Sequence, residues 1–280
     1  MDFSEYQAVF LDLDGTVYHE EHPLPGALEL AAALVAEGHK FACLSNSTTS
    51  PLRIMDRLYH MGIDIGPDHI YTAAAAAADY VVDYYKPILE EVVPQSRPAL
   101  FNLATESFGD MLEGLVDWVE EPVEPCDAVI AGTLVSMYAT EERLRVALQL
   151  LRNGADLVGI CADRVYPSPR GIEFGAGAVC ALLAYAANRR PTFCGKPEPV
   201  FFHKLCQRLQ VDPTQCILIG DNLEADILGA KGVGMKTILT LTGVSRRGDL
   251  ASIPANMQPD VIVESLTELL HKPYEVNPDA

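Results

Sequence analysis

The stretch that decides the fold lies near the N-terminus and reads Ala8-Val9-Phe10-Leu11-Asp12-Leu13-Asp14-Gly15-Thr16. A short apolar run that ends at a turn signal is typical of a buried parallel strand. Asp12 and Asp14 are therefore expected just past its carboxyl end, where open α/β sheets place their ligands. With Gly15 permitting a tight turn, this strand tip can hold a divalent cation while one carboxylate attacks phosphorus.

Length and composition limit the classes of protein to consider. The chain has 280 residues, 49% of them hydrophobic, so we expect a globular protein with two domains of unequal size. The formal net charge is −19. Because such an acidic surface repels nucleic acid and anionic membranes, we expect neither as a partner. A phosphorylated substrate would have to be attracted locally, by a metal ion or a lysine.

The cysteines and the N-terminus bear on location. Seven cysteines are scattered along the chain with no CxxC pair, which indicates reduced thiols rather than a disulfide framework or a zinc site. Residues 1–5 lack the basic region of a signal peptide, and no apolar run has the length of a membrane span. A cytoplasmic location is the expectation.

Strands and helices alternate along the chain. Helical spacing over 27–36 and 50–61, with an apolar strand at 41–44 between, predicts a parallel sheet with helices on both faces. The pattern breaks near Lys86-Pro87 and again at 94–98, where we place a domain crossing. Further strands are expected at 100–103, 128–131, 157–161, 192–194, 216–219, 236–241 and 261–263. Further helices are expected at 73–84, 105–116, 141–153, 175–187, 200–209, 223–231 and 266–270, and the acidic residues 118–125 are expected to form a solvated loop.

Four separated polar groups suited to phosphate lie at predicted strand ends or helix starts. They are Asp12 with Asp14, Ser45 with Asn46, Lys196 in a Gly-Lys-Pro turn, and Asp221 followed by Asp226. Each is weak alone, because a Ser-Asn turn is usually a helix N-cap and an acid in a first helical turn is common. Their shared position on one predicted sheet favours a common phosphate site.

On these residues the sequence resembles the haloacid dehalogenase (HAD) superfamily of phosphatases. The four motifs of that superfamily match in order at Asp12-Leu13-Asp14-Gly15-Thr16, Ser45, Lys196 and Gly220-Asp221 through Asp226. Lys196 lies 151 positions after Ser45, whereas Ser45 lies only 31 after Asp14, so an inserted cap belongs between the second and third motifs. This layout is similar to subclass IIA, which includes NagD and the 4-nitrophenyl phosphatases.

The resemblance implies a doubly wound, mainly parallel α/β core of Rossmannoid type with a smaller inserted α/β cap of the C2 type. The core is expected over 1–86 plus 190–280 and the cap over 87–189. The sequence departs from the branch at Ser47, where a second Asn is often found, at Ala225, where Thr is common, and at Cys161-Ala162-Asp163-Arg164. These departures leave the catalytic set intact and bear on the choice of substrate.

The resemblance also implies a Mg²⁺-dependent hydrolysis of a small phosphomonoester such as a sugar phosphate or nucleotide. Asp12 is expected to form an aspartyl phosphate, while Asp14 protonates the leaving alcohol and then activates water. Asp12 and Asp221 side chains and the main-chain carbonyl of Asp14 are the expected Mg²⁺ ligands. Ser45 and Lys196 are expected to stabilise the phosphoryl charge. Substrate contacts are assigned to Ser45, Asn46, Ser47 and Lys196, and support of the metal site to Asp226.

Other functions stay open at this point. A phosphotransferase or phosphomutase could pass the phosphoryl group of the same intermediate to a sugar hydroxyl, and a non-catalytic protein could bind a phosphorylated ligand without turnover. A Walker-type loop is disfavoured because Arg190 stands where its glycine is required. Relatives often pair through the cap, so a homodimer is expected. Candidates for substrate contact in the cap, equally compatible with a polar surface loop, are Asp163, Arg164, Tyr166, Arg170 and Glu173.

Overall fold

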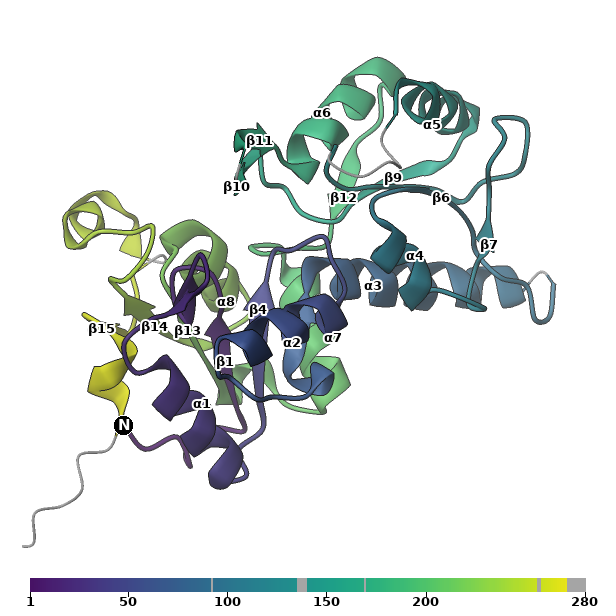
Figure 1. The fold of residues 1–280 in the computed structure, drawn as a ribbon. Helices are drawn as coiled ribbons and strands as arrows, with labels where there is room; N and C mark the ends of the chain where they lie inside the picture. The colour runs from purple at the N-terminus through teal and green to yellow at the C-terminus, as the bar shows by residue number, and fades with distance from the viewer. Residues whose placement is uncertain (92, 135–139, 169, 256–257, 271–280) are drawn as a thin grey trace, which may run out of the picture. The chain divides into compact units, whose positions relative to one another are not determined.

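The structure is a computed structural model that describes residues 1–91, 93–134, 140–168, 170–255 and 258–270 (Figure 1). By contacts, the chain divides into two compact units. The first comprises Met1–Cys43, Arg57–His69 and the described residues from Leu209 onward; the second comprises Leu44–Asp56 and Ile70–Arg208. The cap boundaries at 87 and 189 stay a prediction.

The first unit is built on parallel strands, which confirms the predicted α/β class. Four neighbours pair in the order β15 (Val261–Val263), β14 (Lys236–Thr240), β13 (Cys216–Gly220) and β1 (Ala8–Asp12). The strand β4 (Phe41–Ser45) follows β1 in the order, and its residues up to Cys43 belong to this unit. Every residue of β1 and β13 is buried, as expected for central strands covered on both faces. Their carboxyl ends therefore lie side by side at one edge.

Helices of this unit include α1 (Ala27–Ala36), with the bounds that the periodicity predicts, and α8 (Gly229–Gly232). The continuous helix predicted over 223–231 is wrong in its first part, because Leu223–Leu228 forms a π-helical turn. The carboxamide of Asn222 accepts the main-chain N–H groups of Glu224 and Ala225, at 3.0 Å each. The wider turn leaves the Asp226 carboxylate over Gly220, and such turns are frequent at functional sites. The last predicted helix is a 3₁₀ helix, Leu266–Leu269.

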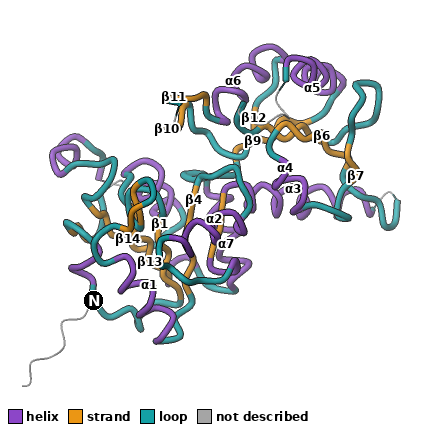
Figure 2. Tube along the Cα trace, viewed as in Figure 1, coloured by secondary structure: helices purple, strands orange, loops and turns teal. Residues whose placement is uncertain are grey.

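The second unit contains a five-stranded, wholly parallel sheet (Figure 2). Its order is β12 (Pro191–Phe193), β9 (Asp156–Gly159), β8 (Ala128–Ala131), β6 (Ala99–Leu103) and β7 (Asp117–Trp118). Helices α5 (Glu141–Asn153) and α6 (Ala176–Ala187) lie side by side in Figure 1 and share an apolar core with these strands. The unit also holds β5 (Ile70–Thr72), α2 (Pro51–His60) up to Asp56, α3 (Ala73–Glu90), α4 (Glu106–Met111) and α7 (Pro199–Leu209) up to Arg208.

Three expectations for this unit are wrong. The helix break at Lys86-Pro87 is absent, because α3 continues through Pro87 to Glu90, where the last turn is exposed and water can satisfy the carbonyl that proline leaves. The helix expected over 105–116 stops at Met111, since Gly114 turns the chain with a φ of 73°. Trp118 lies in β7 rather than in a loop, because this strand pairs with Ala99 and Leu100.

Several short strands were not predicted from the sequence. The cap segment expected as a loop is an antiparallel hairpin of β10 (Val165–Ser168) and β11 (Gly171–Phe174), and a second hairpin joins β2 (Tyr18–His19) to β3 (His22–Pro23). Strands this short carry too few residues for a recognisable alternation. Within the described ranges, every helix is too short or too polar to span a bilayer.

Candidate active site

Three aspartates gather at the carboxyl edge of the first unit's sheet. Asp12 ends β1, Asp221 directly follows the neighbouring β13, and Asp226 lies in the π-helical turn. Carboxylate oxygens from the three lie within 4.8 Å of one another. All three side chains are buried, with at most 6% of their surface exposed. Predicted residues 209 positions apart in the sequence are thus neighbours, as the parallel strand order requires.

Asp14 has a different environment from Asp12. Its residue is exposed, it forms an isolated bridge with Tyr18, and its side chain lies outside the three-carboxylate group. The turn that follows depends on Gly15, whose φ is 90° and whose N–H donates to the Tyr18 carbonyl at 2.8 Å. One carboxylate of the motif is therefore buried beside two other carboxylates, whereas the other is open to solvent.

A phenol and a thiol that interact with these acids, those of Tyr18 and Cys43, stay protonated at neutral pH. Burial, opposed by the charge of Arg57 and reinforced by the charges of Asp14 and Asp12, raises the pKa of Tyr18 to about 12. Burial and the charge of Asp12 raise the pKa of the Cys43 thiol to about 12. Neither group can act as a base near pH 7.

The donor set of the three aspartates fits a hard divalent cation. Buried carboxylates at this separation repel one another, and a cation between them would offset that repulsion. Of the predicted metal residues, the structure groups the side chains of Asp12 and Asp221. Asp226, expected only to support the site, offers an oxygen within the same distance, while its Oδ2 accepts the Asn222 N–H at 3.1 Å.

The second unit holds the other predicted residues. Ser45 ends β4, and its Oγ accepts the main-chain N–H of Ser47 at 3.1 Å. Asn46 and Lys196 are brought together: Asn46 Oδ1 accepts the Lys196 N–H at 2.8 Å, and Asn46 Nδ2 donates to the Lys196 carbonyl at 3.0 Å. Lys196 is only 4% exposed. This contact fixes the lysine's main chain against the turn after β4.

Asn46 also reaches one of the cap candidates. Its Nδ2 donates to Asp163 Oδ1 at 3.3 Å, so both N–H bonds of the carboxamide have protein acceptors. A phosphate contact by Asn46 would therefore come from its main-chain N–H. The other cap candidates lie on or beside the β10–β11 hairpin, where Arg170 forms an ion pair with Glu173 at 3.0 Å, and burial raises the pKa of Tyr166.

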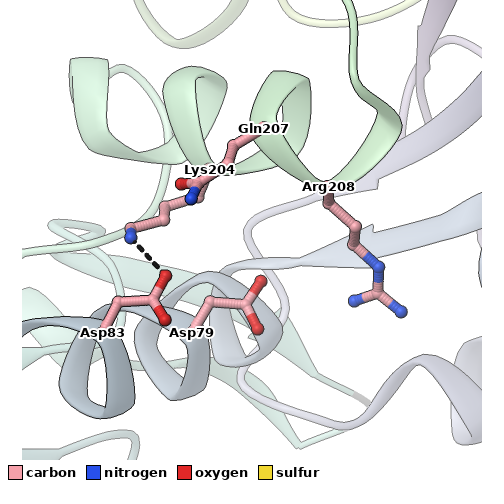
Figure 3. Close-up of a pocket in the computed structure, with 5 residues that line it drawn as sticks. All are labelled: Asp79, Asp83, Lys204, Gln207 and Arg208. Atoms are coloured by element: carbon pink, nitrogen blue, oxygen red, sulfur yellow. Dashed lines mark hydrogen bonds and ion pairs between the residues drawn. The ribbon is translucent and has the colours of Figure 1, made fainter. Parts of the chain in front are cut away.

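A separate hollow of about 340 Å³ lies between α3 and α7 (Figure 3). Its lining residues are Asp79, Asp83, Lys204, Gln207 and Arg208. Lys204 Nζ points to Asp83 Oδ2, 2.6 Å away. Arg208 lies on the other side of Asp79, and its positive charge acts to lower the pKa of that carboxyl group. Opposite charges alternate here, in contrast to the three aspartates of the first unit.

Sequence reasoning missed the turn Thr242–Ser245 after β14. Its main chain contacts Asp221 and its first side chain contacts Gly15. The only sequence signal is a Thr-Gly pair directly after an apolar strand, which is common in turns of any kind.

The comparisons with known proteins agree with the geometry. Residues 9–103 match the family model of haloacid dehalogenase-like hydrolases, and residues 193–269 match the HAD-hydrolase-like model. Acid sugar phosphatase of Staphylococcus aureus is 31% identical over 95% of this chain and 97% of its own length.

Two solved structures have the same fold over nearly the whole chain. The 4-nitrophenylphosphatase of Thermotoga maritima is 27% identical with a TM-score of 0.82, covering 95% of this chain and 97% of that one. NagD of E. coli K-12 is 26% identical with a TM-score of 0.81, covering 94% and 98%. The chain therefore belongs to the haloacid dehalogenase-like hydrolases, as a phosphomonoester hydrolase of subclass IIA, the branch of NagD and the 4-nitrophenyl phosphatases.

Proposed function

We propose that this protein is a Mg²⁺-dependent phosphatase that hydrolyses a small phosphomonoester through an aspartyl phosphate on Asp12. The observation that supports this most strongly is the placement of Asp12, a buried carboxylate at a strand tip within 4.8 Å of the Asp221 and Asp226 oxygens. A nucleophilic carboxylate needs a partner that offsets the charge of the approaching phosphate.

Mg²⁺ would be held by the carboxylates of Asp12 and Asp221 and the main-chain carbonyl of Asp14, with Asp226 orienting the group. When bound, the ion would polarise a phosphoryl oxygen and neutralise charge in the transition state. Asp226 accepts the Asn222 N–H, which keeps its carboxylate turned toward Gly220 and the end of β13.

Asp12 attacks phosphorus in line, so its bond to phosphorus forms as the bond to the alcohol oxygen breaks. Asp14, exposed two residues after Asp12, gives a proton to the departing alkoxide and later takes one from the water that releases phosphate. We propose that Ser45, the main-chain N–H groups of Asn46 and Ser47, and the Lys196 ammonium bind the phosphoryl oxygens during both steps.

The substrate proposed is a sugar phosphate, nucleotide or similar small metabolite. The name of the 31%-identical acid sugar phosphatase favours a phosphorylated sugar. The net charge of −19 disfavours nucleic acid and anionic membranes as partners. A cytoplasmic protein is supported by seven reduced thiols, six of them buried, and a homodimer through the cap remains part of the proposal.

The test is release of inorganic phosphate from 4-nitrophenyl phosphate and from a panel of sugar phosphates and nucleotides, with Mg²⁺ or with EDTA. We expect activity with Mg²⁺, its loss with EDTA, and none in Asp12→Asn. Reduction of the acid-quenched enzyme with borohydride should convert a phosphorylated Asp12 into homoserine. Turnover by Asp12→Asn equal to wild type would refute the proposal, and product phosphorylated on an added sugar would favour a phosphotransferase.

A further inference from the structure

The turn Thr242–Ser245 after β14 contacts two of the four sequence motifs without belonging to any of them. We propose that this turn is a positioning element, which fixes the Asp221 carboxylate and the Gly15 turn in the arrangement that binds the cation. The inference rests on the metal site proposed above and adds to it residues that sequence motifs do not mark.

Main-chain N–H groups of the turn donate to both the side chain and the main-chain carbonyl of Asp221. The Val244 N–H donates to Asp221 Oδ2 at 2.5 Å, and the Ser245 N–H donates to the Asp221 carbonyl at 3.1 Å. The Ser245 hydroxyl accepts the N–H of Leu223, two residues beyond Asp221, at 3.0 Å. A hydrogen bond from an N–H to a carboxylate is among the stronger ones, so it restricts rotation of the Asp221 side chain.

Two glycines make room for that carboxylate. A Cβ on Gly243 would overlap Asp221 Oδ2, and a Cβ on Gly15 would lie 2.6 Å from the same atom. The Asp221 carboxylate is therefore packed against two bare α-carbons, an approach that no other residue type permits. Gly15 needs glycine for its φ of 90° as well, whereas Gly243 has no positive φ. Contact with Asp221 is thus the requirement at position 243.

The side chain of Thr242 connects the turn to the first motif. Its hydroxyl donates to the Gly15 carbonyl at 2.6 Å and lies 2.9 Å from the hydroxyl of Thr240. Through these contacts β14 supports both the turn after Asp14 and the residue after β13. Groups that orient metal ligands typically change metal affinity by about 10- to 100-fold when they are removed.

The test is the dissociation constant of Mg²⁺, measured by titration calorimetry on the whole protein with no substrate present. Gly243→Ala should weaken Mg²⁺ binding by about tenfold or more, because its methyl group displaces the Asp221 carboxylate. Gly248→Ala is the matched control, since a Cβ there meets no atom within 4 Å, and should bind as wild type does. Thr242→Val, nearly equal in shape, should weaken binding severalfold, and Thr242→Ser should restore it.

Wild-type affinity in folded Gly243→Ala and Thr242→Val would overturn the inference and leave the proposed function intact. Absence of Mg²⁺ binding in the wild-type protein would refute the proposed metal site, and the inference with it. Circular dichroism and thermal unfolding show whether Gly243→Ala folds. If it does not, the two Thr242 variants decide. Weaker Mg²⁺ binding in Thr242→Val with recovery in Thr242→Ser supports the inference, and equal affinity in both variants refutes it.

Discussion

Two groups of acidic side chains in this protein have opposite arrangements. Asp12, Asp221 and Asp226 are buried within 4.8 Å of one another. Asp79 and Asp83, on one face of α3, are more exposed and lie opposite the cationic residues of α7 (Figure 3). Asp83 forms an ion pair with Lys204, and Asp79 accepts the Tyr71 hydroxyl at 3.0 Å.

We propose that the difference separates structural charges from functional ones. Exposed, charge-matched pairs contribute little and are tolerated on any surface. Buried like charges cost stability, and a bound cation would offset that cost. Substitutions in the three-aspartate group and its proposed partners should therefore affect catalysis and Mg²⁺ binding, whereas matched substitutions in the α3–α7 group should not.

The largest contrast is expected between Asp12→Asn and Asp83→Asn. The first removes the proposed nucleophile and should lower kcat by roughly a thousandfold or more. The second removes one partner of an exposed ion pair and should leave kcat within twofold of wild type. Steady-state release of phosphate measures both, and similar effects in the two variants would contradict the distinction.

The two lysines should also differ. Lys196→Ala removes a buried cation proposed to bind the phosphoryl oxygens, and kcat should fall by about a hundredfold. Lys204→Ala removes the partner of Asp83 and should change kcat by less than twofold. Unchanged kinetics in Lys196→Ala would exclude this lysine from the site.

Added Mg²⁺ should stabilise the protein through the first group alone. At 100 times the dissociation constant, binding adds about 2.7 kcal/mol to the free energy of unfolding, which raises Tm by roughly 5 to 10 °C. Asp221→Asn should abolish this shift, whereas Asp79→Asn should retain it. Differential scanning calorimetry measures the shift in Tm. A shift of equal size in Asp221→Asn would mean that the cation binds elsewhere.

The smallest effect concerns pH. Burial raises the pKa of Asp79 in the folded protein, despite the opposing effects of its bond to Tyr71 and of Arg208. A raised pKa means that the unfolded chain releases this proton more readily, so the stabilising contribution present at acid pH is lost as pH rises through the folded pKa. In urea unfolding at pH 7, Asp79→Asn should therefore have a free energy of unfolding higher than that of wild type, by about 1 kcal/mol or less. This difference should vanish near pH 3. A gain independent of pH would contradict this assignment.

Much of the first unit could be predicted from sequence because its signals are local. The apolar runs before Asp12 and Asp221 mark buried parallel strands, and parallel strands align their carboxyl ends, so the closeness of these acids follows. The glycine-closed periodicity of α1 gave its bounds correctly. The order and spacing of the four motifs predicted the family, and the 31%-identical relative confirms it.

What could not be predicted depends on contacts between distant main-chain groups. The Val244 N–H on Asp221 leaves no trace in residue type, because every residue except proline has that N–H. The π-helical turn at Leu223–Leu228 places Asp226 over Gly220, an arrangement that the spacing of residues alone does not encode. Pro87 remains inside α3 because the turn around it is exposed, a property of the folded chain.

The most direct test of the central claim is a crystal structure of the protein grown with Mn²⁺ in place of Mg²⁺, with anomalous scattering recorded at the manganese edge. We predict an anomalous peak with carboxylate oxygens of Asp12 and Asp221 at about 2.1 Å, the spacing of a small octahedral cation, and none against Asp79 or Asp83. A peak at the α3–α7 group, or none near Asp12, would contradict the claim that the buried aspartates form the metal site.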